Sequence, residues 1–144
     1  MYTQRERLAG YREALREVGV HETARWERLD DDPDISPELA VQSLLALPEP
    51  PTAIVAGNNR GSAGAVRVLR TLEAPVAFIG FDDFELADAL DISVVAYDPM
   101  ELGRTAARLA LEHLADPAAF TKQVEIPTRL IHRGSGETDR KSVV

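Results

Sequence analysis

The sequence predicts an α/β fold built on a doubly wound parallel sheet. Two continuous apolar runs bounded by turn residues, 53–57 (AIVAG) and 76–80 (VAFIG), carry the prediction. Runs of this kind are typical of buried strands in a parallel sheet. A helical pattern of apolar residues lies between them, and this alternation of strand, helix and strand predicts crossover helices that cover the sheet.

The first third of the chain is predicted to be mostly helical. Thr3 and Glu6 have the spacing of a capping box, and apolar residues follow at helical intervals as far as Gly19. Residues 24–29 alternate weakly between apolar and polar types, which favours a strand. Ser36 followed by Pro37 is typical of a helix start, and this helix is expected to end at Pro48.

The rest of the chain continues the alternation of helices and strands. A second capping box at Asp98 and Glu101 predicts a long helix that ends before Asp116. The polar residues 137–144 are expected to form a mobile tail. The remaining expected elements are helices at 60–72 and 83–90 and strands at 76–81, 92–96, 124–126 and 130–131.

Length and composition exclude several classes of protein. The chain has 144 residues, which is enough for one domain or for part of a larger one. No apolar run approaches the roughly 20 residues that a membrane span needs. The first residues lack the apolar stretch of a secretory signal, so we expect a cytoplasmic protein. A formal net charge of -8 opposes binding to phosphate backbones, so this chain alone is not expected to hold DNA.

Polar residues follow both apolar runs and predict a ligand site. Asn58 comes after the first strand and Asp82 after the second, and ligands of open α/β sheets bind just outside the carboxyl ends of the strands. An ionised carboxylate accepts hydrogen bonds from sugar hydroxyls, and an amide offers both a donor and an acceptor. The alternatives are that Asn58 only caps the following helix and that Asp82 only caps its loop.

Catalytic and metal chemistry find little support in the sequence. Asp82 and Asp83 form an acidic pair, but no nucleophile elbow, phosphate-binding loop or nearby base accompanies them. The three histidines have no metal-ligand spacing, and the chain has no cysteine. We therefore expect a protein that is not an enzyme and has no metal or cofactor.

Five motifs in the same order resemble the C-terminal half of the effector domain of LacI/GalR transcriptional repressors. The resemblance covers about residues 5–136. The motifs are Arg7-Leu-Ala-Gly-Tyr11, Thr52-Ala-Ile-Val-Ala-Gly-Asn-Asn59 with Gly64, Ile79-Gly-Phe-Asp-Asp83, Asp98-Pro-Met-Glu-Leu-Gly103 and Pro127-Thr-Arg-Leu-Ile-His-Arg-Gly-Ser135.

The resemblance implies a periplasmic-binding-protein-like fold in which two α/β lobes close on a small effector, usually a sugar, nucleoside or purine. It also implies a homodimer and a DNA-binding helix-turn-helix ahead of the effector domain. This chain contains neither that head nor the opening strands of the first lobe, so residues 1–136 are expected to be a partial effector domain, mostly the second lobe. The helix that begins at Pro99 would belong to the otherwise missing first lobe.

The resemblance also implies roles for individual residues. Arg7, Asn58 and Asp82 would bind the effector, Arg7 through its rigid fork of N–H donors. Asp32 stands near the place where relatives often carry an aromatic residue that stacks on the ligand. Tyr97 replaces a frequent glutamine and is either a stacking residue or a plain interlobe residue.

Two alternative functions stay open at this point. A solute-binding protein of a sugar transporter shares the fold, although the missing signal peptide and the ending from Arg129 to Ser135 favour a regulator. The other alternative is that the chain is the product of a truncated gene and has no activity.

Overall fold

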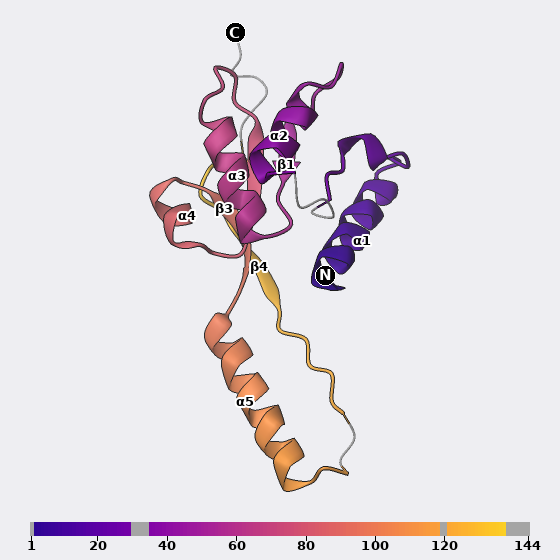
Figure 1. The fold of residues 1–144 in the computed structure, drawn as a ribbon, viewed down its shortest axis with the longest axis vertical. Helices are drawn as coiled ribbons and strands as arrows, with labels where there is room; N and C mark the ends of the chain where they lie inside the picture. The colour runs from indigo at the N-terminus through magenta and orange to yellow at the C-terminus, as the bar shows by residue number, and fades with distance from the viewer. Residues whose placement is uncertain (1, 30–34, 119–120, 138–144) are drawn as a thin grey trace.

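A computed structural model describes residues 2–29, 35–118 and 121–137 of the chain (Figure 1). Helices and strands alternate along most of it, as the sequence predicts. The helices are α1 (Tyr2–Glu17), α2 (Pro37–Leu45), α3 (Asn59–Leu69), α4 (Glu85–Ala89) and α5 (Pro99–Ala115). The strands are β1 (Ala53–Val55), β2 (Ala77–Phe81), β3 (Ser93–Tyr97) and β4 (Thr128–Ile131).

The four strands form one sheet in the order β1-β2-β3-β4. β1, β2 and β3 run parallel, with Val55 opposite Ile79 and Phe81 opposite Val95. β4 departs from the predicted parallel arrangement, because it pairs antiparallel with β3. The mixed α/β class is confirmed, and the carboxyl ends of β1, β2 and β3 lie at the same edge of the sheet.

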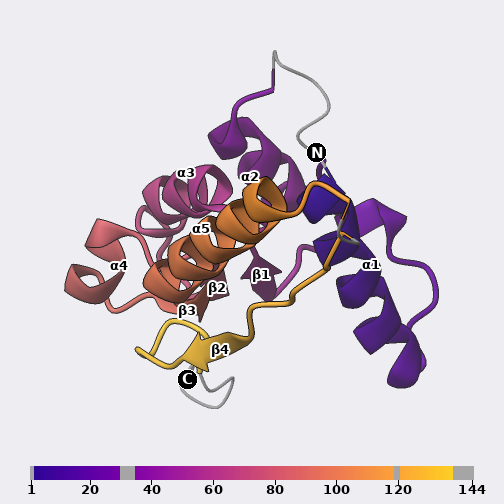
Figure 2. The same ribbon diagram turned by 90° about the horizontal axis from the view of Figure 1, so that it is seen from below.

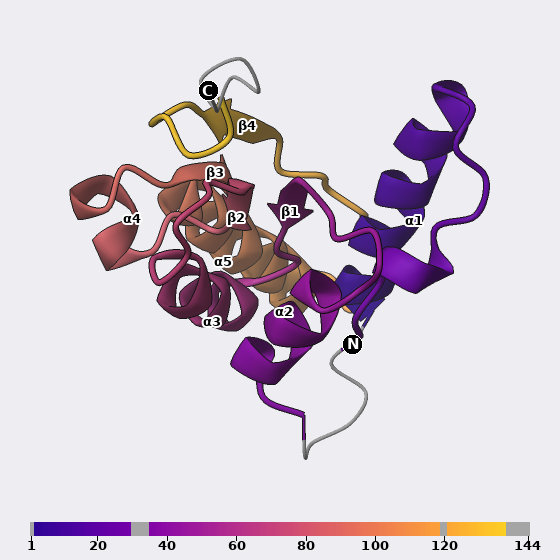
Figure 3. The same ribbon diagram turned by 90° about the horizontal axis from the view of Figure 1, so that it is seen from above.

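The core lies between the sheet and the helices α2 and α3, which pack side by side on one face of it (Figure 3). Val94 of β3 is fully buried, and so is Ser62 of α3. The buried cluster consists of Val41, Ile54, Ala56, Ala65, Val66, Val68, Phe78, Ala87, Ile92, Val94 and Ala96. Alternate residues of β2 point into this core, so buried and half-buried residues alternate along the strand.

Helix α1 lies beyond β1, outside the stack of α2 and α3 (Figures 2 and 3). It ends at Glu17, and Gly19, two residues further on, has φ of +86°, a left-handed conformation that glycine adopts without a steric penalty. Helix α5 extends away from the sheet in the opposite direction from α3, and the chain returns beside it to β4 (Figure 1). Lys122 of the returning segment pairs with Glu112 of α5 at 2.6 Å.

Two predicted strands are wrong. Residues 24–26 form a short 3₁₀ helix, and 27–29 are not in regular structure. The polar side chains of this segment reach neighbouring helices, since Glu27 bonds to Arg12 of α1 and Arg28 to Ser43 of α2. Residues 124–126 are likewise not a strand, because in the part of the chain that the structure describes they pair with no other strand. A strand needs a hydrogen-bonded neighbour, which a local pattern does not supply.

The prediction of a mobile tail at 137–144 concerns residues of which 138–144 lie outside the described part of the chain. Glu137 is described, and its carboxylate accepts hydrogen bonds from the backbone N–H of Gly134 and Gly136. The last described residue is therefore tied to the segment that follows β4.

Candidate ligand site at the strand ends

Residues from four elements meet at the carboxyl edge of the parallel strands. Asn58 follows β1 by three residues, Asp82 follows β2 directly, and Tyr97 is the last residue of β3. Arg7 reaches the same edge from α1. The strand-end rule therefore places Asn58, Asp82 and Tyr97 at one edge of the sheet, and the structure adds Arg7 to them.

Arg7 contacts the ends of both β1 and β2. Its Nη1 donates a hydrogen bond to the carbonyl oxygen of Gly57 at 2.6 Å. Its guanidinium lies over the ring of Phe81, with Cζ 3.6 Å from the ring centroid. A cation stacked on an aromatic face is attracted by the ring's negative π-surface. These two contacts fix the guanidinium beside the residues that precede Asn58 and Asp82.

Asp82 has an unusual conformation and an unpaired oxygen. Its φ is +67°, in the left-handed region that non-glycine residues rarely adopt. Its Oδ1 is buried and has no hydrogen-bond partner among the described residues. A buried oxygen without a partner is destabilising, so such an atom in a folded protein calls for an explanation. A hydroxyl or amine of a bound ligand would satisfy it.

Asn58 is the N-cap of α3. Its Oδ1 accepts a hydrogen bond from the backbone N–H of Gly61 at 2.7 Å. The capping interpretation of Asn58 is thus confirmed for its oxygen. Ser62 lies four residues after Asn58, and its hydroxyl is buried. This hydroxyl donates to the carbonyl of Asn58 at 2.9 Å and accepts from the backbone N–H of Phe81 at 3.1 Å. Ser62 thereby joins the ends of β1 and β2.

Tyr97 and Asp32 have different standing in the structure. Tyr97 is half-buried, lies opposite Thr128 of β4 and precedes Asp98, whose carboxylate caps α5. It therefore stands where the sheet passes into α5. Asp32 lies outside the described residues.

The carboxylate of Asp83 forms an ion pair with Arg133, so Asp83 differs from its neighbour Asp82. Arg133, which follows β4, donates from Nη1 and Nη2 to the two Asp83 oxygens at 2.8 and 3.0 Å. The hydrogen bonds from Arg133 hold the pKa of Asp83 below its ordinary value. Asp83 is therefore charged and engaged, and within the described ranges only Asp82 of this pair has a buried oxygen without a hydrogen-bond partner.

Sequence reasoning assigned no function to Phe81, Ser62 or Arg133. Phe81 stood within a strand motif, and its place immediately before Asp82 was the available signal. Arg133 is 50 residues from Asp83 along the chain, and no local pattern links them. Such a contact becomes visible only when β4 is placed beside β3.

Other kinds of site have no counterpart in the described residues. No group of three or more histidine, aspartate or glutamate side chains is arranged there to hold a metal ion. None of the described helices is long and apolar enough to cross a membrane.

Comparison with known proteins agrees with the fold. The family model of the periplasmic binding protein-like domain matches residues 1–136. The ribose operon repressor of Escherichia coli K12 is 28% identical over 137 residues, and the repressor CytR of the same strain is 30% identical over 135 residues. The chain spans only about two fifths of these relatives: 91% of it covers 42% of the first, and 90% covers 40% of the second.

Solved structures give the same result. A protein assigned as the transcriptional regulator LacI of Bacillus cereus subsp. cytotoxis NVH 391-98 aligns with a TM-score of 0.75 at 26% identity, over 94% of this chain and 50% of its own. The E. coli transcriptional repressor ascG aligns with a TM-score of 0.69 at 29% identity, over 90% and 49%. These relatives are transcriptional regulators rather than enzymes. Because the family model covers nearly the whole chain, the chain belongs to the periplasmic binding protein-like domain family as it occurs in LacI-type regulators.

Proposed function

We propose that this chain is the effector-sensing part of a LacI-type transcriptional regulator and binds a small sugar- or nucleoside-like molecule at the carboxyl edge of β1 and β2. The observation that carries the proposal is the buried Oδ1 of Asp82, which has no hydrogen-bond partner in the described part of the chain and belongs to the residue after Phe81, on which Arg7 stacks. A carboxylate accepts from vicinal hydroxyls, and a guanidinium donates to ring or hydroxyl oxygens.

Asn58 and Tyr97 complete the proposed site. Since the Asn58 oxygen caps α3, its amide nitrogen would be the group that donates to an effector. Tyr97, at the end of β3, would border the effector on the α5 side. Asp32 remains a proposed contact on the grounds of the resemblance alone.

Helix α5 supports the proposal that the working protein is longer than this chain. Its side chains Leu111 and Leu114 are 67% and 76% exposed, and Thr105 is the one buried residue among the described residues of α5. A helix in a folded protein draws most of its stability from the packing of its apolar face against the rest of the protein. We propose that a first lobe, which accounts for part of the length that relatives have in excess, covers this face.

In that longer protein, the effector would stabilise one arrangement of the two lobes and so alter how a homodimer presents its DNA-binding heads. DNA would be bound by the other part of the protein, because this chain carries a net charge of -8. No covalent chemistry and no cofactor are required. A regulator of transcription works beside DNA, so we expect it in the cytoplasm. The repressor relatives favour this function over transport.

Thermal unfolding of the 144-residue chain tests the proposal. The panel contains sugars and nucleosides and begins with D-ribose, because one relative is a ribose operon repressor. A ligand at about 100 times its dissociation constant is expected to add roughly 2.7 kcal/mol to the free energy of unfolding. The shift should disappear in Asp82→Asn, which keeps the size of the side chain, and in Asp82→Ala. A shift that survives both substitutions contradicts the proposed site, and a cooperative melt that no panel member shifts contradicts binding by this chain.

A further inference from the structure

The turn that carries Asp82 makes one backbone hydrogen bond to β3 and one within itself. The N–H of Asp82 donates to the carbonyl of Val95 at 2.9 Å, and the N–H of Phe84 donates back to the carbonyl of Asp82 at 3.2 Å. The left-handed φ of Asp82 is a strained conformation, which persists only when neighbouring contacts hold it. These two backbone bonds do not reach Asp83.

Arg133 holds the other side of the turn. Besides its two hydrogen bonds to Asp83, its Nη1 donates to the carbonyl of Ile92 at 3.2 Å, and its Nε lies 3.4 Å from Oδ1 of Asp88 in α4. Its side chain is only 15% exposed. A planar guanidinium with several donors in use fixes the orientation of a carboxylate more closely than a single contact does.

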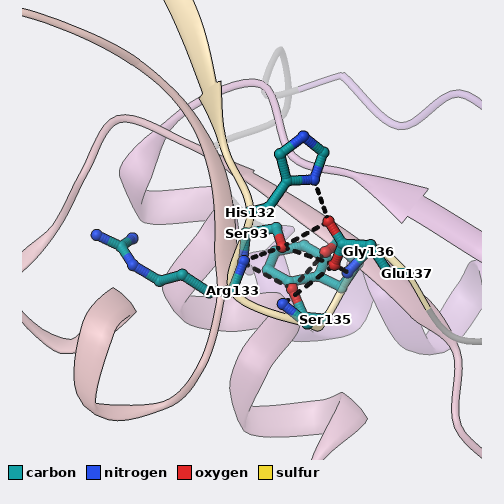
Figure 4. A network of polar contacts seen from close by, with 8 residues as sticks. Ser93, His132, Arg133, Ser135, Gly136 and Glu137 are labelled. Carbon is teal, nitrogen blue, oxygen red and sulfur yellow. Dashed lines mark hydrogen bonds and ion pairs between the residues drawn. The ribbon is translucent and has the colours of Figure 1, made fainter.

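The backbone at Arg133 is itself anchored. Its N–H donates to the hydroxyl of Ser93, which in turn donates to the carboxylate of Glu137 at 3.0 Å. The hydroxyl of Ser135 donates to the carbonyl of Phe78 at 2.6 Å and accepts from the N–H of Ser93. Figure 4 shows these groups gathered in one network, with the side chain of Arg133 pointing away from it.

We propose that Arg133 is a positioning residue for effector binding: it clamps Asp83 and thereby holds the turn in the conformation that presents the Asp82 carboxylate at the sheet edge. The proposal rests on the proposed function, since it gives that site a residue that does not touch the effector. It gives a role to the ion pair between Arg133, in the segment after β4, and Asp83, the residue that follows Asp82. It also predicts that replacing Arg133 loosens the turn while the sheet remains folded.

The test compares the wild-type 144-residue chain with Arg133→Gln, Arg133→Lys and the control Arg67→Gln. Arg67 lies in α3 and pairs with Glu38 at 2.8 Å, so the control also breaks an arginine–carboxylate pair, but one that is distant in sequence from the turn. The first readout is amide hydrogen exchange without ligand. In Arg133→Gln the amides of Asp82 and Phe84 should exchange at least about tenfold faster, while those of Ala56 and Ser62 keep the wild-type rate.

Lysine keeps the charge but not the fork, so Arg133→Lys should give an intermediate exchange rate at Asp82 and Phe84. Unchanged exchange at these two amides in both variants overturns the proposal. So does an equal acceleration at all four amides, which would show a general loss of stability. If Arg133→Gln does not fold, Arg133→Lys decides by the same criterion.

The second readout is the affinity for D-ribose. If Arg133→Gln leaves the competent turn populated in only about a tenth of the molecules, the apparent dissociation constant rises about tenfold. Arg67→Gln should bind as the wild type does. Affinity that is unchanged in a variant with faster exchange overturns the positioning role. If the wild type does not bind D-ribose, the proposal for that sugar fails, whereas the exchange data still decide whether Arg133 holds the turn.

Discussion

The guanidinium of Arg7 stacks on the ring of Phe81, and the same group donates to the carbonyl of Gly57. One side chain thus joins α1 to the ends of two neighbouring strands. Helix α1 lies beyond β1, and none of its contacts with other elements is extensive. Arg7 is therefore a main link between this helix and the sheet.

Replacing Arg7 should lower stability as well as any effector affinity. Arg7→Ala removes the stacking contact, which contributes about 0.5–1 kcal/mol at exposed sites, together with the hydrogen bond to Gly57. Arg7→Lys keeps the charge but loses the planar contact, so it should fall between wild type and Arg7→Ala. Urea denaturation measures the loss. Arg5→Ala, an exposed residue of the same helix, is the control, and an equal effect of the two alanine variants would contradict the linking role.

Ser62→Ala is expected to destabilise the sheet edge. Ser62 is completely buried, and its hydroxyl is the acceptor for the N–H of Phe81. Alanine leaves this N–H without that partner, which costs about 1–3 kcal/mol. Ser43→Ala on the exposed side of α2 also removes a serine hydroxyl with hydrogen bonds and is the matched control. Equal urea midpoints for the two variants would show that the buried hydroxyl is not needed.

Two glycines in helices should respond to alanine with opposite signs. A Cβ at Gly64 would lie 2.4 Å from Cβ of Pro37 and 3.2 Å from the backbone nitrogen of Glu38, so α2 and α3 would have to separate. We expect a loss of about 1–3 kcal/mol. A Cβ at Gly103 in α5 meets nothing within 4 Å, and the higher helix propensity of alanine should add about 0.5–1 kcal/mol. Urea denaturation of both variants checks the signs. A Gly64→Ala variant as stable as the wild type would contradict the close packing of α2 on α3.

The sequence was sufficient where structure is local. Capping residues located the starts of α2 and α5, where the side chains of Ser36 and Asp98 accept hydrogen bonds from the first turn. Capping by Asn58, which the sequence offered as an alternative to ligand binding, holds for α3. Apolar runs located the three parallel strands, and the strand-end rule brought Asn58 and Asp82 to one edge. These signals act within a few residues, so a pattern in the sequence contains them.

The sequence was not sufficient where structure depends on distant partners. Residues 24–26 became a 3₁₀ helix although their alternation favoured a strand, because the neighbouring Glu27 pairs with Arg12 and no described strand pairs with this segment. β4 turned antiparallel, which its composition does not encode. The Arg133–Asp83 and Arg7–Phe81 contacts join residues 50 and more positions apart, and only the folded chain shows them.

Stability should fall as the pH is lowered below about 5, because several carboxylates are stabilised in the folded state. The hydrogen bond from Arg12 lowers the pKa of Glu27 from 4.5, and that from His132 lowers the pKa of Glu137 from 4.5. The hydrogen bonds from Arg133 lower the pKa of Asp83 from 3.8. A group with a depressed folded-state pKa contributes stability above its unfolded value, and this contribution is lost as the pH falls through the folded value.

Of these three carboxylates, Glu27 should contribute most to the pH dependence of stability, because its side chain is only 7% exposed. The side chains of Asp83 and Glu137 are 39% and 42% exposed, so solvent screens their ion pairs more strongly. We expect the urea midpoint to be nearly constant from pH 7 to 6 and to fall steadily from pH 5 to 3. In Glu27→Gln the midpoint should be lower at pH 7 and should fall less steeply, because the amide has no proton to gain. Glu13→Gln, at an exposed position of α1, should keep the wild-type slope. If Glu27→Gln keeps that slope too, the Arg12–Glu27 pair is not the source of the acid sensitivity.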